Sequence, residues 1–135
     1  MPASYYLANK LIDHQLGKTA YTMPIVYVGV SSTTPAQGAP VTNVTEPSSG
    51  SYARVATSGV TWNAGAAGAT SNAAAITFPA ATADWAAAAN MTYGVLYDAS
   101  TVGNILGYGA LTVAKNVLNG DTLSIAIGGL TLTIS

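Results

Sequence analysis

The side chains that could act in catalysis are few and lie far apart in the sequence. His14 is the single histidine, and Asp13 beside it projects from a different side of the helix predicted there. A catalytic triad needs an acid that orients the histidine and a serine within its reach, and nothing in the sequence places either. The five acidic residues are all separate from one another: Asp13, Glu46, Asp84, Asp98 and Asp121. We therefore expect no enzyme activity.

The residue types also argue against metal and cofactor sites. The chain has no cysteine, which excludes thiol catalysis, disulfide bonds and zinc sites made of cysteine. Gly103, Gly107 and Gly109 are spaced like part of a nucleotide-binding loop, but they fall within predicted strands and not before a helix. We expect neither a metal ion nor a cofactor.

Two tryptophans offer a different kind of chemistry. An exposed indole ring can stack on a sugar, so Trp62 and Trp85 are candidates for a glycan site, although in a small β-domain such residues more often belong to the core. Glu46 lies upstream of Arg54, and we expect any ion pair between them to be structural, because neither has a catalytic partner nearby in sequence.

The chain carries unusually little charge. Only 7% of its residues are charged, against roughly 25% in an average protein, and its formal net charge is −1. The basic residues are scattered: Lys10, Lys18, Arg54 and Lys115. Nucleic-acid binding through phosphates is therefore not expected. Because so few charges repel neighbouring molecules, the composition favours a subunit that is covered by neighbours in an assembly. The alternative is a monomer whose surface consists of Thr, Ser, Asn and Gly.

The order of apolar and charged residues predicts neither a membrane span nor a secretory signal. No apolar run approaches the ~20 residues of a membrane span. Residues 1–18 lack the basic leader and apolar block of a secretory signal.

By its length the chain is predicted to form a single domain, residues 1–135, with an N-terminal helical arm (1–20) and a β-sandwich (21–135). The arm contains a helix at residues 4–16, which Ser4 can cap and Gly17 can end. Apolar side chains recur along it at helical spacing: Tyr5, Ala8, Ile12 and Leu16. At about thirteen residues this helix is too short to be stable alone, so it must pack on the sheet or on a neighbouring subunit.

Alternating apolar and polar residues predict strands in the rest of the chain. Residues 91–113 read as a hairpin on which the domain is built, and residues 25–31 as a central strand buried on both faces. About eight such runs are present, which is typical of an all-β, antiparallel β-sandwich or jelly roll. The proline-rich residues 33–50 cannot form regular structure and are expected to be a variable contact surface.

Several segments, taken in order, resemble a family of small structural proteins of tailed-phage virions. They include YVGVSSTTP (27–35), EPSSGSYARV (46–55), SNAAAITFPAATADW (71–85), LYDAS (96–100), GNILGYGAL (103–111) and NGDTLSI (119–125). Members of this family are labelled as tail-fibre or minor tail proteins and as head decoration or cement proteins. The chain has Trp85-Ala86 where members often have Trp-Gly.

This resemblance implies a capsid decoration protein, a homotrimer on the outer surface of the virion head that binds the major capsid protein and stabilises the shell. Such a protein is made in the cytoplasm of the host bacterium. The alternative is a tail-fibre or minor tail module that binds a host-surface glycan through Trp62, Trp85 and exposed tyrosines. Neither reading involves nucleic acid or a membrane. The residues that we predict at the interface are Tyr5, Tyr6, Leu7, Leu11, Pro35 and Pro40.

Overall fold

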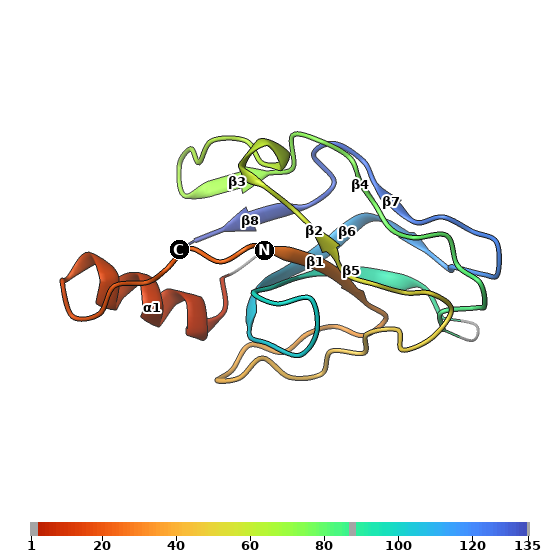
Figure 1. Cartoon of the computed structure of the whole chain (residues 1–135), viewed down its shortest axis with the longest axis horizontal. Coiled ribbons are helices and arrows are strands. Elements are labelled where there is room, and N and C mark those ends of the chain that lie inside the picture. Colours follow the sequence, from red (N-terminus) through yellow and green to blue (C-terminus); the bar gives the residue numbers. More distant parts are fainter. Residues whose placement is uncertain (1–2, 87–88, 135) are drawn as a thin grey trace.

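The computed structural model describes residues 3–86 and 89–134 and consists mainly of antiparallel strands. Figure 1 shows a body of strands with the single helix projecting from one end. The elements are α1 (Tyr5–Gln15), β1 (Tyr27–Ser31), β2 (Val55–Ala56), the 3₁₀ helix η1 (Gly59–Thr61), β3 (Ala69–Ser71), β4 (Ile76–Thr77), β5 (Met91–Tyr97), β6 (Ile105–Lys115), β7 (Ser124–Ile125) and β8 (Thr131–Thr133). The prediction of an all-β fold with one N-terminal helix is confirmed.

The predicted hairpin and the predicted central strand form most of the largest sheet. Its strand order is β2-β1-β5-β6, and every neighbouring pair is antiparallel. β1 lies between β2 and β5, with Val28 opposite Leu96 and Val30 opposite Gly94. Residues 28–31 are all buried, as the continuous β-branched run predicts for a strand covered on both faces.

Two smaller sheets cover one face of this main sheet. They are the pairs β3–β8 and β4–β7, drawn above the main sheet in Figure 1. The largest core lies between the layers, where Val28, Val30 and Leu96 of the main sheet meet Ile76 and Ile125 of β4 and β7. The layers are therefore held together by apolar burial, the dominant favourable contribution to folding.

The proline-rich residues 33–50 cover the opposite face of the main sheet, below it in Figure 1. A second cluster forms there, in which Val41 packs with Val95, Tyr97 and Tyr108. This coverage by an irregular segment explains why β1 and β5 are buried on both sides, although both smaller sheets of the described residues lie on the other face.

The local strand pattern departs from the sequence prediction at two places. A register shift between Met91 and Tyr93 places Met91 in the large core, whereas Val95 and Tyr97 lie in the cluster on the other face. Strict alternation would put Met91, Tyr93, Val95 and Tyr97 on one face of the strand, and the irregularity in β5–β6 pairing reverses this for Met91. Residues 59–61 form the 3₁₀ helix η1, although the sequence there is also compatible with a strand that continues to residue 62.

Helix α1 begins and ends as the sequence predicts. The Ser4 hydroxyl accepts a hydrogen bond of 3.1 Å from the Leu7 N–H, and Gly17 follows the helix with φ +74°. The start of the helix is attached to the body, because the N–H groups of Ala3 and Ser4 donate to Thr133 of β8 and Leu106 of β6. Only its first turn is fixed by the sheet in this way.

Candidate functional site

The groups that could do chemistry do not converge into one site. Within residues 3–86 and 89–134, no three or more His, Asp and Glu side chains lie close enough to hold a metal ion. His14 Nδ1 accepts a 3.0 Å hydrogen bond from the Tyr21 N–H, and Asp98 accepts two from Asn104. The first bond holds the segment after α1, and the second closes the β5–β6 turn, so both groups have structural roles.

The two tryptophans have different environments. Trp85 is only 5% exposed, its ring lies edge-on to Tyr52 at 5.0 Å, and its Nε1–H donates to the Gly50 carbonyl. Trp62 is half-buried and donates from Nε1 to the Thr57 hydroxyl. The hypothesis of a sugar-stacking surface is therefore wrong for Trp85, which belongs to the core.

A polar cluster of Glu46, Tyr52, Arg54 and Tyr97 confirms the predicted ion pair. The Arg54 guanidinium donates from Nε and Nη2 to both Glu46 carboxylate oxygens at 2.8 and 2.9 Å, and its carbon lies 3.4 Å from the centroid of the Tyr97 ring. Burial raises the pKa of Tyr97 to about 12, and the nearby Glu46 carboxylate adds to the shift. Burial and the hydrogen bond to Glu46 also raise the pKa of Tyr52.

This cluster joins three segments that are distant in sequence. Arg54 Nη1 donates to the Ala99 and Val102 carbonyls in the β5–β6 turn, at 2.9 and 2.8 Å. The Tyr52 hydroxyl donates to Glu46 and accepts from the Val30 N–H of β1. With its donors and acceptors paired inside the protein, the cluster is built to stabilise the fold and not to bind a ligand.

The predicted interface residues do not form a single surface. Pro35 is buried and so offers little area to a partner. Tyr6 and Pro40 line one cleft of about 390 Å³, together with Asn9 and Asn104, between α1, the proline-rich segment and the β5–β6 turn. This cleft brings together two of the six predicted residues.

Leu7 and Leu11 line a different and entirely uncharged groove beside α1, which we call the α1 groove. Its volume is about 400 Å³, and its walls are α1, the segment before β1, Trp62 and the end of β8. Residues that contribute apolar area to it are Leu7, Leu11, Met23, Trp62, Leu132 and Ile134. Such a groove can bind a row of apolar side chains by burying them, but it has no charged group that would orient a polar ligand.

The α1 groove continues along the helix into a second pocket of about 490 Å³. Leu11 and Ile134 line both, and the second pocket also includes Ala8, Ile12 and His14. The apolar side chains around this region are unusually exposed, with Leu16 at 74% and Met23 at 88%. Exposed apolar surface of this extent marks a protein interaction site more often than a free surface.

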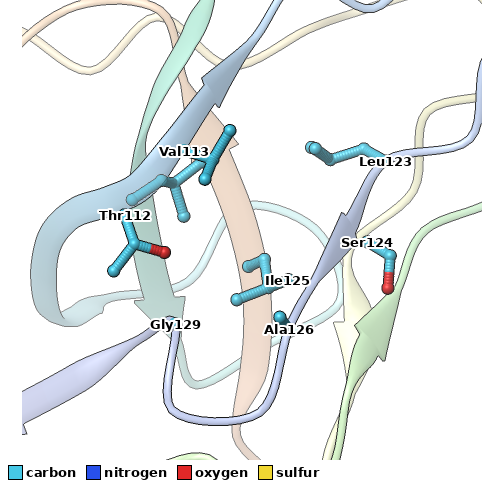
Figure 2. A pocket seen from close by; sticks show the side chains of 8 residues that line it. Thr112, Val113, Leu123, Ser124, Ile125, Ala126 and Gly129 are labelled. Atoms are coloured by element: carbon cyan, nitrogen blue, oxygen red, sulfur yellow. The ribbon is translucent and has the colours of Figure 1, made fainter.

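A third pocket lies at the other side of the body, between β6 and β7. Figure 2 shows Thr112 and Val113 on one wall and Leu123, Ser124 and Ile125 on the other. Its volume is about 270 Å³, and hydroxyl groups are the only polar side-chain groups that line it. No acid, base or aromatic ring is positioned there to act on a ligand.

Three exposed apolar residues were not predicted from the sequence: Met23, Ile25 and Ile134. Ile25 was predicted to begin the buried central strand, but β1 begins at Tyr27 and Ile25 is 61% exposed, so that part of the prediction is wrong. Met23 and Ile134 line the α1 groove, and only the fold brings them to α1.

The comparison with protein-family models defines the family. No helix among the described residues is long and apolar enough to cross a membrane. No curated protein matches the sequence. Residues 2–133 match the family model described as "Podophage GP4 fiber I protein gp80", which covers nearly the whole chain. The chain therefore belongs to the podophage GP4 fiber I protein gp80 family, a family of phage virion structural proteins.

Proposed function

We propose that this protein is a structural subunit of a podophage fibre and that it attaches to the virion assembly through the surface around α1. The observation that carries the proposal is the match of residues 2–133 to a family described as a fibre protein. The structure adds an apolar surface at one end of a compact β body, formed by α1 and by Met23 and Ile134.

The physical properties of the chain support a binding role without catalysis. A fibre subunit must hold its shape while one surface is covered by neighbours. The layered core and the polar cluster around Arg54 provide a rigid body, and the low charge opposes packing against neighbours only weakly. Neither nucleic acid nor a membrane enters this proposal.

Glycan binding by the two tryptophans does not form part of the proposal. Trp85 is in the core, and Trp62 faces the uncharged α1 groove, where no side chain is placed to bind several sugar hydroxyls. The fibre role proposed here is therefore one of assembly.

Capsid decoration is the alternative to be separated from the fibre role. The resemblance in the sequence includes head decoration proteins, and a homotrimer bound to the major capsid protein would also cover an apolar surface. The description of the family as a fibre protein favours the fibre role.

Gold labelling of intact virions with an antibody against this chain tests the choice between the two roles. We expect the label on the fibres at the tail. Label scattered over the head would refute the fibre role and support decoration, and heat resistance of capsids with and without the protein would then be the next measurement.

A further inference from the structure

Apolar side chains recur at helical spacing along α1 and its C-terminal end, and most of them are largely exposed. The row consists of Tyr5, Ala8, Ile12 and Leu16, spaced three, four and four residues apart; Ala8 is half-buried, and the other three are at least half exposed. Leu7 is the one buried residue of the helix, on its other side. This spacing is the anchor pattern of a helix that lays an apolar face into a groove of another protein.

A groove of the matching kind lies beside the same helix. The α1 groove and its continuation are lined mainly by apolar side chains, with His14 and Gln15 at the far end of α1, and both share Leu11 and Ile134. The helix cannot fill this groove in its own chain, because its Leu7 and Leu11 already form one wall. Tyr5 and Leu16 line neither part of the groove, whereas Ile12 lies on the wall of its continuation, so the row and the groove form one continuous apolar surface that only another molecule can cover.

We propose that the occupant of the α1 groove is a second copy of this chain, which inserts the outer row of its own α1. The inference rests on the proposed function, since it takes the surface around α1 as the attachment surface and names its partner. In this arrangement Ile12 and Leu16 of one copy contact Met23 and Ile134 of the other.

The exposed apolar area is close to what such a contact needs. Five apolar residues of the row and the groove are about half exposed or more: Tyr5, Ile12, Leu16, Met23 and Ile134. At roughly 200 Å² for a fully exposed large side chain, together they expose on the order of 600 Å². Each partner in a standard protein interface buries roughly 800 Å², whereas the largest apolar patch of a typical monomer is ~300–600 Å².

Charge also favours a second copy over a strongly charged partner. No Asp, Glu, Lys or Arg lines either part of the groove. The net charge of −1 gives two copies little reason to repel each other. An apolar segment of a different virion protein is the competing occupant, and it would leave the purified chain monomeric.

Sedimentation velocity of the purified full chain over roughly 1–200 µM tests the inference. We expect concentration-dependent association in the wild type. Ile12→Gln, which alters the row and the wall of the groove's continuation, and Met23→Gln, which alters the α1 groove alone, should each weaken it by about tenfold or more. The matched control is Ile127→Gln, the same change at a residue that is 68% exposed and lies in the turn after β7, and it should associate like the wild type.

Disulfide trapping tests the geometry, because the natural chain has no cysteine. Under mild oxidation, a mixture of Ile12→Cys and Met23→Cys chains should form mixed dimers well above the yield from Ile127→Cys with Met23→Cys. Equal yields in the two mixtures would overturn the proposed contact.

A wild-type chain that stays monomeric up to about 200 µM would overturn the inference, as would association that Ile12→Gln and Met23→Gln leave unchanged. Circular dichroism melting of each variant shows whether it is folded, and these exposed positions should tolerate glutamine. The two proposals fail separately: a monomer whose label lies on fibres refutes only the self-association, and label on the head refutes only the fibre role.

Discussion

Replacing Arg54 by methionine should destabilise this protein more than any other change of a charged side chain. Arg54 is only 8% exposed at its side chain, and Glu46 is 23% exposed. Methionine keeps most of the apolar stem of arginine but removes every donor. The Glu46 carboxylate would then keep the Tyr52 hydroxyl as its protein donor, and the Ala99 and Val102 carbonyls would lose theirs.

The size of the effect follows from the burial of the pair. Removing one partner of a buried ion pair costs ~3–5 kcal/mol, and the partial exposure of Glu46 places this case near the lower end, at about 3 kcal/mol. Each kcal/mol shifts the melting temperature of a domain of this length by roughly 3–4 °C. Arg54→Met should therefore melt about 10 °C below the wild type.

Urea unfolding and thermal melting, both followed by circular dichroism, measure this difference. Lys18→Met is the matched control, because it removes the same charge at an exposed position and should change stability by less than ~0.5 kcal/mol. The double variant Arg54→Met with Glu46→Gln should recover part of the loss, since it no longer leaves a carboxylate without its partner. An Arg54→Met protein as stable as Lys18→Met would refute the argument.

Three further predictions concern the sheet, the tyrosines and the helix. Gly29→Ala places a Cβ 2.6 Å from the Tyr52 hydroxyl and should lower the free energy of unfolding, measured in urea, by about 2 kcal/mol. Gly59→Ala is the control, because a Cβ there meets nothing within 4 Å, and it should lower the free energy far less. Equal losses of stability in the two variants would contradict this. The pKa of Tyr97 is about 12 in the folded protein and ~10 in the unfolded chain, so the folded state keeps the proton to higher pH. The contribution of Tyr97 to the free energy of unfolding should therefore be constant below pH ~10 and fall as the pH rises toward 12. A free energy of unfolding that stays flat up to pH ~12 would contradict this. Ser4→Ala removes the cap of α1 and should lower stability by about 1 kcal/mol, measured by thermal melting, and an unchanged melting temperature would show that the cap contributes nothing.

Long periodic segments of the sequence predict the fold well. The alternation over residues 91–113 corresponds to the paired strands β5 and β6, and the run at residues 25–31 corresponds to β1 at the centre of the sheet. A glycine inside a strand marks a bulge or a close approach of another part of the chain, and at Gly94 a Cβ would lie 2.7 Å from the Leu130 side chain of the facing layer. These features follow from local pattern and sterics, which a sequence displays directly.

Short strands and surfaces depend on partners that a sequence does not display. β2, β4 and β7 have two residues each, and their pairing is set by the layers around them and not by their own propensity. The Glu46–Arg54 pair can be predicted from the charges alone. The stacking of Arg54 on Tyr97 cannot be predicted without knowing the register of β1 and β5. The α1 groove was missed for the same reason, since Met23 and Ile134 meet only through the fold.

The exposed end of the proposed attachment surface, at Ile12 and Leu16, is separable from the folding core because of how α1 is held. The helix has eleven residues, fewer than the ~12–15 that an isolated helix needs even for marginal stability. The body fixes its first turn through Ala3, Ser4 and Leu7, whereas Ile12 and Leu16 bury little area in the free chain. A partner that covers these two side chains supplies stability that the helix lacks alone, so association and order in its second half are coupled. Polar replacements there should therefore weaken assembly while leaving the β body, and its melting, almost unchanged.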